Sequence, residues 1–210
     1  MFASPIDEAA SQDIASFDRS VTSHLLIALM DRVECGLLAC GPMGELLHAN
    51  LAAQRALREA SILRLVDACV CASACKQDAW IAALRNAATR RRSSLVEVGD
   101  GESRTMLAVM PGHADIGGEP GVIVVMGRRS PCSALGLEMF AGSHGLTHAE
   151  SRVLRALVDN RSTREIAASH GVAVATVRSQ IQAVRDKLGV RSIDALLLRA
   201  AEVPPVTARH

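Results

Sequence analysis

The last third of the chain carries two helix-start signals of one kind, and they constrain its local structure more than any other feature. Residues 147–150 (THAE) and 162–165 (STRE) both fit the capping box, in which a hydroxyl and a carboxylate three residues apart satisfy each other's backbone N–H groups. Gly171 and Gly189 can take the left-handed conformation that ends a helix, and Ser192 can cap another. These signals predict four helices within residues 144–202, with a glycine turn between the second and the third.

The third of these helices, expected over residues 174–188, has one apolar face. Val177, Ile181, Val184 and Leu188 recur at the period of a helix that packs on a core. Val172, in the preceding turn, is expected to enter the same core. A helix, a glycine turn and a second helix form the helix-turn-helix arrangement, whose second helix enters the major groove of DNA.

The neighbouring face of this helix carries long polar side chains. Arg178 and Gln182 lie on it, and Arg can bond two acceptors of guanine while Gln can pair with adenine. Side chains that flank this face, and the N–H groups that begin the helices, suit phosphate. The residues expected to contact phosphate are Thr163, Arg164, Thr176, Arg185 and Lys187.

The distribution of charge agrees with a polyanionic partner at this end of the chain. Residues 144–210 hold 10 Lys+Arg and 6 Asp+Glu, a net charge of +4, whereas residues 1–143 hold 13 and 16, a net charge of −3. Aromatic residues make up only 2% of the chain, so the exposed rings on which single-stranded nucleic acid stacks are few.

The chain is expected to begin with a helix over residues 7–32. Apolar side chains gather on one of its faces among Asp, Ser and Arg. This face either packs on its own domain or pairs two subunits, and the two interpretations stand on an equal footing. The face consists of Ile14, Phe17, Val21, Leu25 and Leu29.

Residues 33–128 combine strand and helix patterns. Two short strands, CGLLAC and ELLHAN, flank the turn GPMG. Asn50 then caps a helix, and helical sequence is expected to continue to about Arg92. A hairpin about Asp100-Gly101 follows, with its return strand over residues 104–110. PGHADIGGEP is expected to be a loop, and GVIVVM at 121–126 suits a strand buried on both faces.

This order of elements resembles a PAS-type sensory domain. The fold class is therefore expected to be α+β, with a PAS-like antiparallel sheet and helices followed by an all-α helix-turn-helix domain. The expected divisions are an N-terminal helix at 1–32, the PAS-like domain at 33–128, a linker at 129–143, the helix-turn-helix domain at 144–202 and a tail at 203–210.

Four short motifs follow one another in the last domain. Glu150 stands three residues after the threonine of the first helix, E-I-A fills 165–167, T-V-R fills 176–178 and K-L-G-V fills 187–190. With these motifs, residues 144–202 resemble the LuxR-type DNA-binding domain of bacterial transcription regulators.

The resemblance implies roles for particular residues. Arg178, Ser179 and Gln182 occupy the positions that face bases. Ala173 departs from the family, which usually has Ser or Thr there as a helix cap worth about 1 kcal/mol, and Gln180 replaces a common His. The last helix is implied to pair two copies through Ile193, Leu196, Leu197 and Ala200.

The cysteines allow a different interpretation. Cys69, Cys71 and Cys75 follow the spacing C-x-C-x3-C, with Cys35 and Cys40 upstream, which is not the paired C-x2-C of a zinc site. On a helix, Cys71 and Cys75 would share a face. We expect small core side chains, with a thiol-based redox or iron–sulfur sensor as the alternative function.

Two further groups are interpreted as surface features. His144 and His148 are spaced to share a metal ion, but no third ligand is near in sequence, so a solvated helix start and no metal site are expected. The three arginines at 90–92 are expected at an exposed helix end, with a DNA or partner contact as the other interpretation.

The sequence shows no G-x-S-x-G motif, phosphate loop or paired carboxylates, so we expect neither an enzyme nor a cofactor. We expect a dimeric, sequence-specific regulator that binds double-stranded DNA, modulated by an unknown small-molecule or redox signal, with RNA polymerase as a further candidate partner. A promoter-recognition subunit of the polymerase would need a second helical domain where strands are expected. The acidic start and the short apolar runs predict a soluble, cytoplasmic protein without membrane contact.

Overall fold

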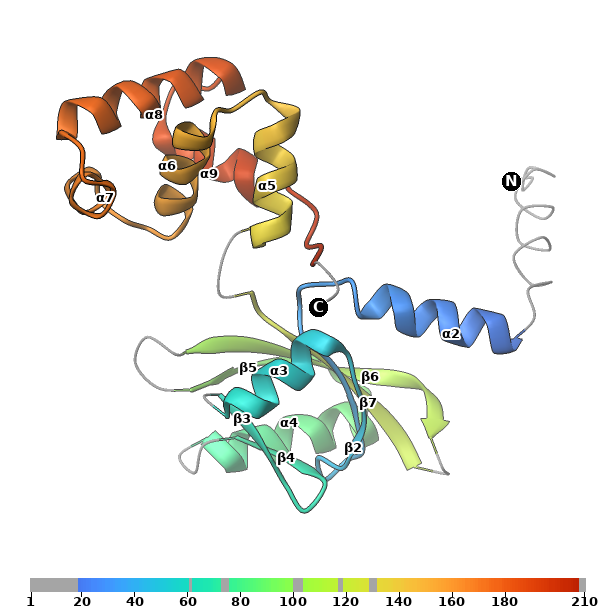
Figure 1. Ribbon diagram of the computed structural model, residues 1–210. Coiled ribbons are helices and arrows are strands. Elements are labelled where there is room, and N and C mark those ends of the chain that lie inside the picture. The colour runs from blue at the N-terminus through green and yellow to red at the C-terminus, as the bar shows by residue number, and fades with distance from the viewer. Residues whose placement is uncertain are drawn as a thin grey trace, which may run out of the picture.

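Two separate hydrophobic cores divide the chain. The computed structural model describes residues 19–60, 62–72, 76–99, 104–116, 119–128 and 132–207. One core gathers buried side chains between Leu38 and Met126, and the other gathers those between Cys132 and Ala200. Figure 1 shows the two domains, with helix α2 (Arg19–Met30) projecting from the side of their junction.

The N-terminal domain is built on one antiparallel sheet. Its strands are β1 (Leu37–Cys40), β2 (Leu46–Ala49), β5 (Ser94–Val98), β6 (Thr105–Ile116) and β7 (Glu119–Met126). They are hydrogen-bonded in the order β2-β1-β7-β6-β5, so the last strand of the domain lies in mid-sheet beside the first. The expected PAS-like antiparallel sheet is confirmed.

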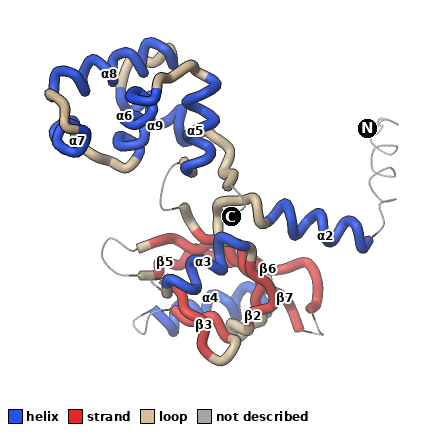
Figure 2. Tube along the Cα trace, in the orientation of Figure 1, coloured by secondary structure: helices blue, strands red, loops and turns tan. Residues whose placement is uncertain are grey.

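Helices α3 (Leu51–Glu59) and α4 (Gln77–Arg90) complete this domain. Figure 2 shows both beside the strands, and α4 packs against β5, β6 and β7. The single tryptophan, Trp80 of α4, is fully buried, and its indole N–H donates to the Val70 carbonyl at 2.7 Å. The aliphatic core thus closes around one aromatic side chain whose polar atom is satisfied.

The segment before α4 was expected to be helical, and this prediction is wrong. Residues 63–72 form a two-stranded hairpin of β3 (Leu63–Val66) and β4 (Cys69–Ala72). Its turn places Asp67 at φ 49° and Ala68 at φ 63°, as a tight two-residue hairpin turn requires. Cys71 therefore lies on strand β4 and not on a helix, so the helical face that it was expected to share with Cys75 does not form. Cys75 lies outside the described residues.

Two strand predictions also need correction. β6 continues through Pro111 to Ile116, where a loop was expected, because its partner β7 is long enough to pair with it there. β7 is not buried on both faces: Val122 and Val124 are buried, whereas Ile123 is 40% exposed. The Asp100-Gly101 turn lies outside the described residues.

The C-terminal domain contains five helices within the described residues. They are α5 (Ala134–Ser143), α6 (His148–Val158), α7 (Thr163–His170), α8 (Val174–Leu188) and α9 (Ile193–Ala201). The last four agree with the helices expected from the caps. Helix α5 precedes them, and its Leu137 is buried in their common core.

The apolar face of α2 is not covered by the rest of the chain. Leu25, Leu26 and Leu29 are 57%, 53% and 54% exposed. Ile14 and Phe17, which belong to the same expected face, lie outside the described residues. Packing on its own domain therefore does not account for this face in the described part of the helix. No described helix is both long enough and apolar enough to span a membrane.

The Asn50 amide joins the start of the sheet to α3. Its Oδ1 accepts from the N–H groups of Ala53 at 3.0 Å and Leu37 at 2.9 Å, and its Nδ2 donates to the carbonyls of Met30 at 2.9 Å and Cys35 at 3.0 Å. The side chain is fully buried. The predicted N-cap is confirmed, and the same side chain also fixes the connector between α2 and β1.

Replacing Asn50 by Ala should lower the free energy of unfolding by roughly 2–4 kcal/mol, because it removes a helix cap and leaves buried backbone groups unpaired. The fluorescence of Trp80 during urea titration measures the change. Gln54→Ala is the matched control: this exposed amide makes one bond, to the Ala49 carbonyl, and its loss should change stability by less than about 1 kcal/mol. Equal losses in the two variants would contradict the role given to Asn50.

Candidate nucleic-acid interface

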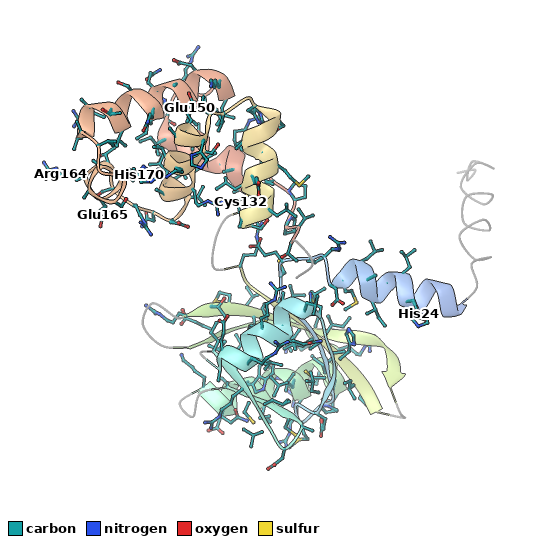
Figure 3. The ribbon with its side chains drawn as sticks, viewed as in Figure 1. His24, Cys132, Glu150, Arg164, Glu165 and His170 are labelled. Carbon is teal, nitrogen blue, oxygen red and sulfur yellow. The ribbon has the colours of Figure 1, made fainter. Side chains whose placement is uncertain are left out.

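Helix α7 is fixed by a complete capping box. The Glu165 N–H donates to Ser162 Oγ at 3.3 Å, and the Ser162 N–H donates to Glu165 Oε2 at 2.7 Å. Hydrogen bonds from the Ser162 hydroxyl and then from its N–H hold the pKa of the Glu165 carboxyl below its usual range. Figure 3 shows Arg164, Glu165 and His170 on this short helix. Thr163 and Arg164, expected at phosphate, form its first turn, where Arg164 is exposed and Thr163 half-buried.

The turn between α7 and α8 is closed by backbone bonds. Gly171 has φ 66°, and the Val172 N–H donates to the Ala167 carbonyl at 3.1 Å. Val172 is 39% exposed, so its predicted place in the core is wrong. Its main chain closes the preceding helix. Val174, two residues later at the start of α8, packs against the core instead.

Helix α8 has the expected buried seam. Val177, Ile181, Val184 and Leu188 are all buried, with at most 7% of each side chain exposed. The helix packs on α6 and α7 through this seam. At its start, Ala173 has the extended backbone of an N-cap, φ −67° and ψ 148°, but no side chain that caps. The departure noted in the sequence therefore leaves an uncapped N-terminus on the helix.

The face of α8 beside this seam is exposed and polar. Within the described part of the chain, no side chain holds the Arg178 guanidinium. The Ser179 hydroxyl donates back to the Ala175 carbonyl at 3.1 Å. Gln182 donates to Asp186 Oδ1 at 2.7 Å through its Nε2. Arg178 is thus ready for an external partner, whereas Gln182 has an internal one.

Residues 144–200 match the family described as bacterial regulatory proteins of the luxR family. The C-terminal domain is a LuxR-family helix-turn-helix domain. No curated protein matches the chain. Members of this family are DNA-binding transcription regulators and not a class of enzyme, so the expected class of function is confirmed at that level.

Solved structures of VqmA are similar to the chain at low identity. The phage VqmA–DPO complex is 17% identical over 89% of this chain and 93% of that chain, with a TM-score of 0.37. A Vibrio cholerae VqmA dimer without target DNA is 17% identical over 83% and 85%, with a TM-score of 0.36. A VqmA–ligand–DNA complex, also from Vibrio cholerae, is 17% identical over 86% and 89%, with a TM-score of 0.34. At these values the likeness carries no argument about this chain.

Lys187 of the LuxR-family domain has an internal partner where phosphate was expected. Its ammonium donates to Glu150 Oε2 at 2.7 Å and to the Gly145 carbonyl at 2.9 Å. The hydrogen bond from Lys187, and next that from the Thr147 N–H, hold the pKa of the Glu150 carboxyl below its usual range. This ion pair ties the end of α8 to the start of α6. No local signal in the sequence predicts this pairing, because the two residues stand 37 positions apart.

The two remaining residues expected to contact phosphate, Thr176 and Arg185, differ in exposure and in internal partners. Thr176 is exposed on the first turn of α8. Arg185 is half-buried and donates to Gln182 Oε1 at 3.2 Å and to the Arg191 carbonyl. Burial, followed by the charges of Arg152 and Arg161, lowers the pKa of His170 and favours its neutral form. Of the side chains expected to contact DNA, the two guanidinium groups without an internal hydrogen-bond partner are therefore Arg164 on α7 and Arg178 on α8.

The four residues of α9 that were expected to pair two copies differ in their exposure to solvent. Leu196 and Ala200 are fully buried in the domain's own core, so they support α9 from within. Ile193 is 38% exposed, Leu197 is half-buried, and Leu198, which was not selected from the sequence, is 66% exposed. A second copy could meet only the exposed members of this set.

The cysteines do not form a reactive group in the described residues. Burial raises the pKa of the Cys40 thiol to about 12, with Glu45 and Cys69 adding to the effect, which disfavours the thiolate that redox chemistry needs. Cys69 and Cys71 are half-buried and free. No three His, Cys, Asp or Glu of the described residues are grouped so as to hold a metal ion.

Replacing Ala173 by Ser should raise the free energy of unfolding of the LuxR-family domain by about 1 kcal/mol, because its backbone already has the conformation of a cap. The helical circular dichroism signal during urea titration measures the gain. Ala175→Ser is the matched control: it adds the same hydroxyl two residues later, in the first turn. A gain at 173 no larger than that at 175 would show that the start of α8 is satisfied in another way.

Proposed function

We propose that the chain is a dimeric, sequence-specific transcription regulator that reads the major groove with α8 and is modulated by its PAS-like domain. The observation that carries the proposal is the division of α8 into a buried aliphatic seam and an exposed polar face. Burial of the seam holds the helix axis in place, so the outward side chains meet DNA in a fixed geometry. A helix of this kind fits the major groove.

Arg178 is the residue to which we assign the main base contact. Its guanidinium is exposed and unpaired within the described residues, and Arg pairs with two acceptors of guanine. Ser179 adds a hydroxyl on the same turn. Gln182 can pair with adenine once it releases Asp186, which now accepts from it at 2.7 Å.

Phosphate contacts are assigned to the starts of α7 and α8. The first turn of α7 carries Thr163 and Arg164, and the first turn of α8 carries Thr176, so each start offers a hydroxyl and the positive end of a helix dipole to an anion. Arg185 can join them, since its bonds to Gln182 and Arg191 lie at the surface. Lys187 is left out of this set because it already neutralises Glu150.

Dimerisation is supported by apolar surface that the monomer leaves uncovered. The three leucines of α2 are more than half exposed, and on α9 Leu198 and Ile193 are exposed as well. Contiguous apolar surface of this kind marks an interface more often than a monomer surface. Two copies of α8, related by a twofold axis, would read half-sites about one helical turn apart.

Modulation by the PAS-like domain is supported by its fold and by its covalent attachment to the LuxR-family domain. The signal is proposed to be a small molecule or a redox change. The buried Cys40, whose thiol has its pKa raised to about 12 by burial, is a poor candidate for the redox change. RNA polymerase is the proposed partner of the DNA-bound regulator.

Arg178→Ala should weaken binding to a site selected from random DNA about 10- to 100-fold, or roughly 1–3 kcal/mol, and should relax the preference at one base pair. Arg164→Ala is the matched variant, because removal of a phosphate contact should weaken binding to all sequences alike and reduce the salt slope by about one. Fluorescence anisotropy at several salt concentrations measures both. Binding by Arg178→Ala as tight as that of the parent would remove the base-reading role.

Replacing Leu25 and Leu29 together by Lys should convert the dimer to a monomer, because two charges then occupy the surface that pairs. Sedimentation velocity measures the change. Leu65→Lys with Val66→Lys is the matched control, since these side chains are 48% and 43% exposed on β3, away from α2. A parent chain that sediments as a monomer, or a dimer that survives the α2 change, would refute pairing through α2.

A further inference from the structure

The C-terminal tail returns to the N-terminal domain after α9 ends. Val206 forms an antiparallel bridge with Val33. On either side of the bridge, the Glu34 N–H donates to the Pro205 carbonyl at 2.8 Å and the Thr207 N–H donates to the Arg32 carbonyl at 2.9 Å. In Figure 1 the described end of the chain, drawn in red after α9, accordingly runs toward the junction of the two domains. We call Val203–Thr207 the strap.

The segment that receives the strap is itself held by the PAS-like domain. Asn50 donates to the carbonyls of Met30 and Cys35, which flank the paired residues. Asp31 Oδ1 accepts from the Leu51 N–H at 2.9 Å, at the first residue of α3. The strap is therefore bonded to a connector that takes its position from the start of α3.

The strap also contacts the linker that follows the PAS-like domain in sequence. The Ser133 hydroxyl donates to the Val206 carbonyl at 2.5 Å while accepting from the Gly136 N–H at the start of α5. A Cβ on Gly136 would stand 2.8 Å from Ser133 Oγ and 3.0 Å from Val203 Cγ1. Glycine is thus required where α5, the linker and the strap meet.

Two features weaken the contact between the strap and the rest of the chain. A cavity of about 410 Å³ lies between α5 and the strap, lined in part by Met139, Phe140 and Val206. Glu34, whose N–H bonds the strap, has its Oε2 buried without a hydrogen bond from the described residues. Unfilled space and a buried oxygen without a donor both reduce the stabilisation that a contact gives.

We propose that the strap is a releasable clamp that fixes the orientation of the LuxR-family domain on the PAS-like domain. The linker supplies one attachment and the strap a second, so the domain is held at two points and cannot rotate freely. A change at the start of α3 moves the connector and opens the clamp. The recognition face of α8 is not covered by the strap, so the clamp controls orientation and not access to DNA. This role for orientation rests on the proposed function.

Limited trypsin digestion tests the clamp without DNA. Arg128 is exposed at the end of the PAS-like domain, directly before the linker, and the arginines at 90–92 at the end of α4 provide an internal reference. Four forms are compared: the parent, a truncated chain that stops after Val203, Thr207→Pro, which lacks the N–H that bonds the Arg32 carbonyl, and Thr207→Ala, which keeps it. Cleavage tracks the open population, so it should rise about tenfold at Arg128 in the truncated and proline forms only.

Each outcome of the digestion decides the proposal. A rise confined to Arg128 in the truncated and proline forms supports the clamp. Equal rates in all four forms would overturn it, and so would a rise in Thr207→Ala equal to that in Thr207→Pro. A matching rise at 90–92 would show general unfolding of the PAS-like domain and would also overturn it.

Half-site spacing tests the consequence for DNA. Moving two half-sites apart by about five base pairs, half a helical turn, turns them to opposite faces of the duplex. The parent should lose roughly tenfold in affinity on this change, whereas the truncated chain should lose less than about threefold. Equal losses of affinity in the parent and the truncated chain would overturn the claim that the strap controls the orientation of the LuxR-family domain. Failure of the parent to select any site would refute the proposed function, and the digestion would still decide the clamp.

Discussion

Burial of four aliphatic side chains on α8 is the interaction on which the DNA-binding half of the molecule depends. Val177, Ile181, Val184 and Leu188 supply no chemistry of their own, yet they decide which way every polar residue of the helix points. Because the seam runs the whole length of the helix, a rotation about its axis would expose apolar surface at every turn. The polar face is consequently held as firmly as the core is packed.

Polar contacts then refine what the seam has fixed. The two capping boxes set where α6 and α7 begin, and the ion pair of Lys187 with Glu150 fixes the far end of α8 against the start of α6. The start of α8 has no such support, since Ala173 offers no side-chain oxygen. The helix is therefore anchored more firmly at its C-terminal end than at the end that carries Arg178.

Local signals in the sequence predicted the C-terminal domain well and parts of the N-terminal domain poorly, and the reason is physical. Capping boxes, glycine C-caps and a helical apolar period act within a few residues of one another, so α6 to α9 follow from the sequence directly. The β3–β4 hairpin depends on a turn in which Ala68 stands where glycine is usual, and on packing against α3. The partner of Lys187 and the bridge between Val33 and Val206 join distant segments, for which a single sequence contains no local signal.

The internal network of Gln182 has a consequence for how such a helix would discriminate among duplexes. Its amide is held by Asp186 on one side and Arg185 on the other, so any base that engages it must first displace a carboxylate. Random duplex offers no compensation for that exchange and meets the negative charge of Asp186 as well. If Gln182 contacts a base as proposed, a weakly matched sequence would not compensate for the loss of these internal hydrogen bonds, and a well-matched one would.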